Sequence, residues 1–130
     1  MSNIKICVIG AGKWGINHIN TLHEIGALGG VVDIDQKKIE TIKNKFPLIK
    51  SFTNIINSFK ESFDGFIIAT PPNTHFEIAK SILTCKKPVL VEKPLSLSYS
   101  EGKKIQLLCH KLDGKLIVGH LLLFHPAIEK

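Results

Sequence analysis

The chain has 130 residues, which suits one domain with a buried core and is too short for two complete domains. Its net charge of +6 is the balance of 17 lysines and 11 acidic residues. The lysines are spread along the chain without arginine or interleaved aromatics, so we expect no nucleic-acid partner. The three cysteines are widely spaced and form no C-x-x-C pair, which argues against a disulfide framework and against a metal site. The sequence shows no signal pattern and no apolar stretch of ~20 residues, so we expect a cytoplasmic protein that does not contact membranes.

The first predicted element is a buried strand over residues 4–9, which is short, rich in β-branched side chains and bounded by glycine. A helix is predicted over residues 13–25 from its apolar spacing. Between them lies the sequence Gly10-Ala11-Gly12-Lys13-Trp14-Gly15. In a strand-to-helix turn the first glycine permits a tight bend, the second lets a pyrophosphate approach, and the third lets helix and strand pack closely. The turn therefore predicts a dinucleotide site that includes Lys13 and Trp14.

The second predicted strand, residues 29–32, ends at Asp33, about 20 residues past the glycines. A carboxylate at this position accepts hydrogen bonds from the adenosine ribose hydroxyls, which favours NAD over NADP. The alternative is that Asp33 only shapes the turn. Asp35 is the better candidate for capping the next predicted helix, residues 36–44.

Strands and helices continue to alternate along the chain. Strands are predicted over residues 48–52, 65–69, 88–91 and 116–119, and helices over 54–59, 74–84 and 98–112. This alternation predicts an α/β fold, a doubly wound parallel sheet of about six strands with helices on both faces. Residues 1–119 form the predicted dinucleotide-binding domain, and 120–130 read as the start of a C-terminal substrate domain.

Polar residues follow the fourth and fifth predicted strands, where ligands bind in such sheets. The first loop carries Thr70, Pro71, Asn73 and His75, and either Asn73 or Thr74 is expected to cap the next helix. A stiff connecting loop with no further role is the alternative. The second loop carries Glu92 and Lys93.

Lys93 can hydrogen-bond a substrate hydroxyl or a ribose, although a lysine at a strand end is often only exposed. Glu92 either lines the cofactor pocket or pairs with a nearby lysine. His18, one turn past Gly15, is expected to serve helix packing or a hydrogen bond.

Together these motifs resemble the cofactor domain of the Gfo/Idh/MocA family, which includes glucose-fructose oxidoreductase, inositol dehydrogenase and sugar-nucleotide dehydrogenases. The resemblance extends over nearly the whole chain and rests on the glycine turn, on residues 32–35, on residues 69–75 and above all on Glu92-Lys93-Pro94. It implies that Gly10, Gly12, Gly15 and Asp33 bind NAD. It also implies that Lys93 lies beside the nicotinamide and the substrate as the catalytic residue, and that the peptide bond before Pro94 is cis.

The resemblance further implies an oxidoreductase that transfers a hydride to or from a sugar or a nucleotide-linked sugar, and that forms a homo-oligomer at full length. In that family a second domain supplies most of the substrate pocket and a catalytic Asp-x-x-x-His, and no Asp of this chain has a His four residues later. We therefore expect the 130-residue chain to bind NAD and to turn over substrate negligibly by itself. The alternatives are a stand-alone NAD-binding or redox-sensing module and one half of a split enzyme.

Overall fold

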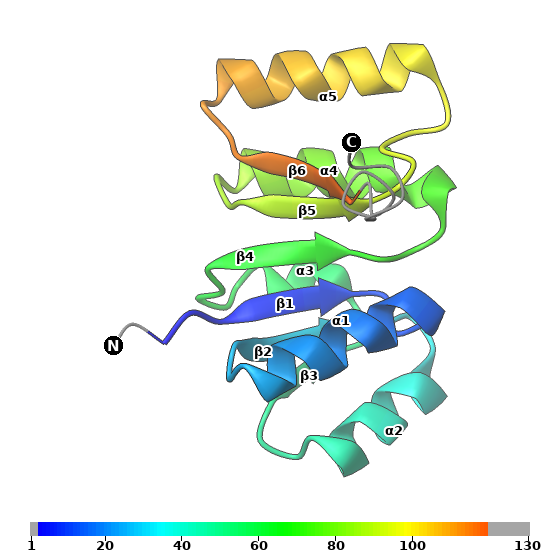
Figure 1. Ribbon diagram of the computed structural model, residues 1–130, viewed down its shortest axis with the longest axis vertical. Helices are drawn as coiled ribbons and strands as arrows, with labels where there is room; N and C mark the ends of the chain where they lie inside the picture. Colours follow the sequence, from blue (N-terminus) through cyan, green and yellow to red (C-terminus); the bar gives the residue numbers. More distant parts are fainter. Residues whose placement is uncertain (1–2, 120–130) are drawn as a thin grey trace, which may run out of the picture.

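A six-stranded, wholly parallel sheet in the order β3-β2-β1-β4-β5-β6 forms the centre of the computed structural model, which describes residues 3–119 (Figure 1). The prediction of a doubly wound parallel sheet is confirmed. The predicted start of a second domain at residues 120–130 lies outside the described residues. The strands are β1 (Ile6–Ile9), β2 (Leu28–Val32), β3 (Lys50–Phe52), β4 (Gly65–Ile68), β5 (Val89–Glu92) and β6 (Leu116–Gly119).

Helices cover both faces of the sheet, so two apolar cores form. One core joins the sheet to helices α1 and α2 through Ile19, Leu22, Ile39 and Ile42, and the other joins it to α4 and α5 through Ala79, Ile82, Leu83 and Ile105. No helix within residues 3–119 combines the length and the hydropathy that crossing a membrane requires. The helices are α1 (Lys13–Glu24), α2 (Gln36–Lys45), α3 (Ile55–Ser58), α4 (His75–Thr84) and α5 (Tyr99–Lys111), with a short 3-10 turn, η1 (Pro72–Thr74), before α4.

The helix starts show which capping predictions were correct. Asp35 caps α2 by accepting a hydrogen bond from the Lys37 amide at 2.9 Å, as predicted. The prediction that Asn73 or Thr74 caps α4 is wrong, because η1 precedes α4 and its start has no side-chain cap. The Thr74 hydroxyl instead donates to the Pro71 carbonyl at 2.7 Å, back into its own loop.

A pair of glycines in β2 makes room for an aromatic ring. A Cβ on Gly29 or Gly30 would come within 2.8 Å of Lys5 Cβ or 2.6 Å of Phe63 Cζ, respectively. Phe63 is only 4% exposed and packs edge-on against Phe66, with ring centroids 5.9 Å apart. The glycines therefore let this strand pass beside the ring, and edge-on aromatic pairs add stability beyond the area that they bury.

Cys7 provides a test of the buried centre of the sheet. Its side chain is fully buried in β1, and this burial raises the pKa of the Cys7 thiol, so the reactive thiolate does not form. We expect a thiol-labelling reagent to modify the exposed Cys85 on the folded protein and Cys7 only after denaturation. Peptide mass spectrometry at successive times measures both rates. Labelling of Cys7 as fast as Cys85 in the folded protein would contradict the burial of β1.

Candidate functional site

Each glycine of the turn between β1 and α1 meets a different steric requirement. Gly10 has a positive φ of 103°, and a Cβ there would lie 2.6 Å from the carbonyl oxygen of Ala69. A Cβ on Gly15 would lie 1.8 Å from the carbonyl oxygen of Gly10, so the helix can approach the strand only without a side chain. A Cβ on Gly12 would meet no atom within 4 Å. Gly10 and Gly15 therefore shape the turn, whereas Gly12 borders open space that a ligand can enter.

Asp33 connects the glycine turn to the end of β2. Its Oδ2 accepts a hydrogen bond from the Ala11 amide at 2.8 Å, and its Oδ1 accepts one from the Asp35 amide at 2.8 Å. An ionised carboxylate has about four acceptor positions, so both oxygens can still accept from a ligand hydroxyl. Asp33 thus holds the turn in place and keeps acceptor capacity where β2 ends.

The start of α1 differs from the starts of α2, α3 and α5. Asp35, Asn54 and Ser98 accept hydrogen bonds from first-turn amides of those three helices. The residue before α1 is Gly12, which has no side chain to cap the helix. The first amides of a helix point out of its N-terminus and carry a partial positive charge. The first turn of α1 is therefore suited to hold an anionic group beside the open space at Gly12.

The loop after β4 is braced by its own hydroxyl groups. Thr70 Oγ1 and Thr74 Oγ1 lie 2.6 Å apart. Since Thr74 gives its proton to Pro71, the Thr70 hydroxyl is the donor in this bond. These contacts keep the loop in a fixed conformation beside the glycine turn, where the amide of Ala69 donates to the carbonyl of Ile9 at 2.8 Å.

These segments enclose a cleft of about 1010 Å³ at the carboxyl ends of the first four strands. The structure brings seven of the predicted site residues together there. They are Gly10, Gly12, Trp14, Asp33, Thr70, Pro71 and Asn73. The cleft combines a helix N-terminus, a carboxylate and an exposed indole with apolar walls, a donor set that fits the phosphates, ribose and bases of a dinucleotide.

The other five predicted site residues are not among the residues that line the cleft. They are Lys13, Gly15, His75, Glu92 and Lys93. Lys13 and Lys93 are exposed, Lys13 at the start of α1 and Lys93 after β5, and Gly15 is buried against Gly10. The Lys93–Pro94 peptide bond is cis, as the resemblance implied.

Two of these residues, His75 and Glu92, bond to other parts of the protein. His75 is 1% exposed, and its ring nitrogens lie within hydrogen-bond distance of two main-chain carbonyl oxygens, so the ring offers no free polar atom to the cleft. Glu92 pairs with His18, the Oε1 to Nε2 distance being 2.5 Å, and not with a lysine. The expectation that His18 makes a hydrogen bond is confirmed.

The cleft also contains residues that the sequence analysis did not select. Thr53, Asn54 and Ile55 follow β3, and Ile34 and Lys38 follow β2. Ligands bind beyond the carboxyl ends of parallel strands, and this rule applies to β3 as well. The position of residues 53–55 directly after β3 could therefore have identified them as candidate site residues. Ile34 is 92% exposed, which indicates an apolar contact surface at the Asp33 end of the cleft.

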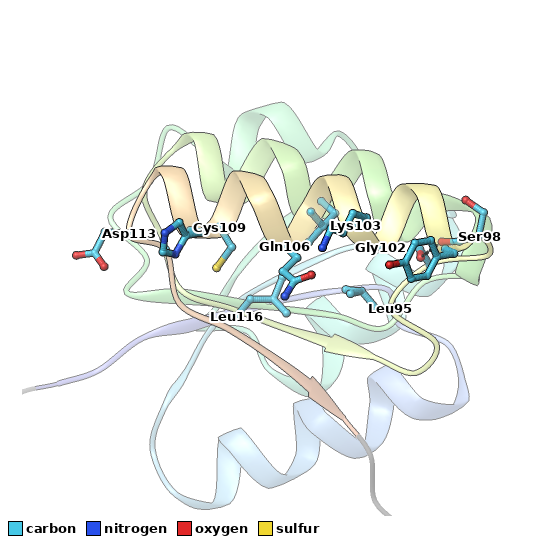
Figure 2. Close-up of a pocket in the computed structure, with 13 residues that line it drawn as sticks. Leu95, Ser98, Gly102, Lys103, Gln106, Cys109, Asp113 and Leu116 are labelled. Atoms are coloured by element: carbon cyan, nitrogen blue, oxygen red, sulfur yellow. Dashed lines mark hydrogen bonds between the residues drawn. The ribbon is translucent and has the colours of Figure 1, made fainter.

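A second groove, of about 660 Å³, lies between α5 and β6. Figure 2 shows Gln106 and Cys109 extending from α5 toward Leu116, with Leu95 beside the same helix, farther to the right in this view. None of the predicted site residues lines it. Because its polar side chains do not surround a common point, the groove is a weaker candidate than the cleft at the glycine turn.

Comparison with known proteins places the chain among oxidoreductases. Residues 4–120 match a family described as the oxidoreductase family with an NAD-binding Rossmann fold. The chain is 33% identical over 117 residues to glucose-6-phosphate 3-dehydrogenase of Bacillus subtilis, covering 88% of this chain and 33% of that protein. It is 26% identical to UDP-N-acetylglucosamine 3-dehydrogenase of Acidithiobacillus ferrooxidans, covering 99% of this chain and 41% of that protein.

The fold agrees with solved structures of such proteins. A crystal structure of a probable dehydrogenase from Thermotoga maritima superposes with a TM-score of 0.89 at 27% identity, covering 95% of this chain and 38% of that one. The chain therefore spans well under half the length of these relatives.

Two alanine substitutions in the turn separate folding from binding. Gly15→Ala places a Cβ against the Gly10 carbonyl, and we expect it to lower the free energy of unfolding by about 3 kcal/mol or more. Gly12→Ala adds a Cβ in open space, so we expect a loss of at most ~1 kcal/mol in stability. Its NADH affinity should nevertheless fall roughly tenfold, because the methyl group occupies the approach of the pyrophosphate.

Urea unfolding followed by circular dichroism and titration with NADH measure the two effects. Equal effects of the two substitutions on stability would contradict the packing described for Gly15.

Proposed function

Because this chain belongs to the Gfo/Idh/MocA oxidoreductases through their NAD-binding Rossmann fold, we propose that its cleft binds NAD, with Asp33 at the adenosine end and Lys93 at the nicotinamide end. The order of groups along the carboxyl edge of the sheet carries the proposal. From β2 across β1 and β4 to β5, this edge presents Asp33, the glycine turn, Thr70 and Lys93 in turn. A dinucleotide laid across the edge needs an acceptor for ribose, donors for pyrophosphate and polar groups at the reactive ring, in the same order.

Different residues along the cleft are proposed to bind different parts of NAD. The Asp33 carboxylate accepts hydrogen bonds from the adenosine ribose hydroxyls with the acceptor positions that Ala11 and Asp35 leave free. The uncapped first turn of α1 donates to the pyrophosphate beside Gly12. The loop at Thr70 and Pro71 forms the next part of the wall. NAD supplies the hydride-accepting carbon, nicotinamide C4.

Lys93 is the proposed catalytic residue. It follows β5, next to the strand whose end forms the cleft wall at Thr70, and its side chain is exposed. An ammonium group carries three donors, so Lys93 can donate a hydrogen bond to the hydroxyl oxygen of a bound alcohol and orient it. In its neutral amine form Lys93 can accept the proton that leaves as the carbonyl forms, and it becomes the ammonium. The chain's own contribution to the chemistry is this positioning and proton handling.

We propose a sugar or a nucleotide-linked sugar as the substrate of the whole protein. Similarity to a sugar-phosphate dehydrogenase and to a UDP-sugar dehydrogenase supports this class. The test is NADH formation from NAD by the whole protein, followed by absorbance, with glucose 6-phosphate, inositol or UDP-N-acetylglucosamine as the substrate. Turnover of neither sugar substrate nor the sugar-like polyol inositol, with turnover of simple alcohols, would refute the substrate class.

Cofactor binding is tested with NADH and NADPH while the emission of Trp14 is followed. Trp14 is the single tryptophan of the chain, lines the cleft and is 50% exposed, so a docked nicotinamide cofactor should quench it. We expect saturable quenching, with NADH bound roughly tenfold more tightly than NADPH because the Asp33 carboxylate repels a 2′-phosphate.

Asp33→Asn removes the negative charge and should reduce the preference for NADH. The ratio of the two affinities is the useful readout, because the single amide oxygen of Asn can keep only one of the two backbone hydrogen bonds of Asp33, and this loss weakens both cofactors alike. Saturable binding of neither cofactor would refute the proposed function.

A further inference from the structure

We propose that His18 and His75 are positioning residues that fix Lys93 from opposite faces of the sheet. The inference rests on the proposed function, since it takes Lys93 as the group that meets the cofactor and substrate. The two histidines bond to the residues on either side of Lys93. His18 pairs with the Glu92 side chain, and His75 bonds to the Pro94 carbonyl.

His18 provides the contact from the α1 face. Its Nε2 lies 2.5 Å from Glu92 Oε1, and the side chains are 25% and 13% exposed, so the bond is partly shielded from water. A charge-assisted bond in such a setting is stronger than one on the surface. Helix α1 is itself fixed by the contact between Gly15 and Gly10, one turn before His18. The end of β5 is thereby connected to the glycine turn.

His75 provides the contact from the α4 face. It is the first residue of α4, is 1% exposed, and has Nδ1 at 2.7 Å from the Pro94 carbonyl and Nε2 at 2.8 Å from the Thr70 carbonyl. Carbonyl oxygens only accept hydrogen bonds, so the imidazole donates from each nitrogen that carries a proton, which in the neutral ring is one of the two. One buried ring therefore lies between the loop after β4 and the loop after β5, with a nitrogen against a carbonyl of each. A side chain used only for packing at this position would need no polar atoms.

These contacts leave Lys93 in a distinctive position. The residues before and after it are each held by a histidine, while its own side chain is exposed. None of these three side chains is among the residues that line the cleft, and of the three only Lys93 is exposed. A catalytic group must be held close to its productive geometry, and residues outside the ligand contact supply that constraint. His18 and His75 meet this requirement for Lys93.

The first test needs no ligand. Backbone amide order parameters of Lys93 are measured by NMR relaxation in the wild-type chain, His18→Leu, His18→Gln and His75→Leu. We expect the value at Lys93 to fall from about 0.85 toward 0.6 in both leucine variants. His18→Gln keeps an N–H donor at similar reach and should restore the wild-type value. Val89 and Val91 within β5 serve as internal references, and their values should not change.

The second test is a double-mutant cycle on NADH affinity. We expect His18→Leu and His75→Leu each to weaken NADH binding roughly tenfold in the wild-type background and less than about twofold in a Lys93→Ala background, because positioning residues act through Lys93. If the histidines had only a structural role, each substitution would reduce NADH affinity by the same factor in both backgrounds. His110→Leu, on the exposed surface of α5, is the matched control and should leave affinity unchanged.

The two tests separate failure of this inference from failure of the proposed function. If the wild-type chain does not bind NADH, the proposed function fails, and the order parameters still decide whether the histidines fix Lys93. Unchanged order parameters at Lys93 in both leucine variants, or equal losses of affinity in both backgrounds, would overturn the inference. If His75→Leu does not fold, the order parameters of His18→Leu and His18→Gln and the double-mutant cycle of His18 with Lys93 still decide whether a histidine positions Lys93.

Discussion

The close contact between α1 and the carbonyl of Gly10 is the constraint on which the site depends. Gly15 comes so near that a Cβ there would lie 1.8 Å from that oxygen. This approach brings the N-terminus of α1 to the carboxyl end of β1, where its first amides face the cleft. Asp33 then holds the intervening Ala11 amide. The position of the uncapped start of α1 at the cleft thus follows from one backbone contact and one carboxylate.

The order of strands determines what lies beside that turn. From β1 the chain runs outward through β2 to β3 and then returns to place β4 on the other side of β1. The helices change faces at the same point, since α1 and α2 pack on one side and α4 and α5 on the other. A crevice opens where neighbouring connections leave in opposite directions. Residues far apart in sequence, such as Asp33 and Thr70, therefore line one cleft.

Local patterns in the sequence were sufficient for the strands, for the glycine turn and for the Asp35 cap, because a few adjacent residues determine these features. Local patterns could not predict which distant side chains bond to one another. His18 and Glu92 are 74 residues apart, and His75 and Pro94 are 19 apart, and no periodicity connects either pair. The prediction of a cap for α4 was wrong for a related reason. The Thr74 hydroxyl donates to the carbonyl of Pro71 earlier in the loop, and the general preference of Thr for capping positions does not predict this bond.

Motif membership alone does not distinguish a residue that touches a ligand from one that holds the site together. His75 and Asp33 both belong to polar motifs at strand ends, yet their surroundings differ. The ring nitrogens of His75 are used within a 1% exposed environment, whereas Asp33 lines the cleft and retains acceptor positions. A ligand-contacting group needs both access and unused hydrogen-bonding capacity. By that criterion Asp33 is placed to meet a ligand in the cleft, whereas the polar atoms of His18 and His75 bond to the residues on either side of Lys93.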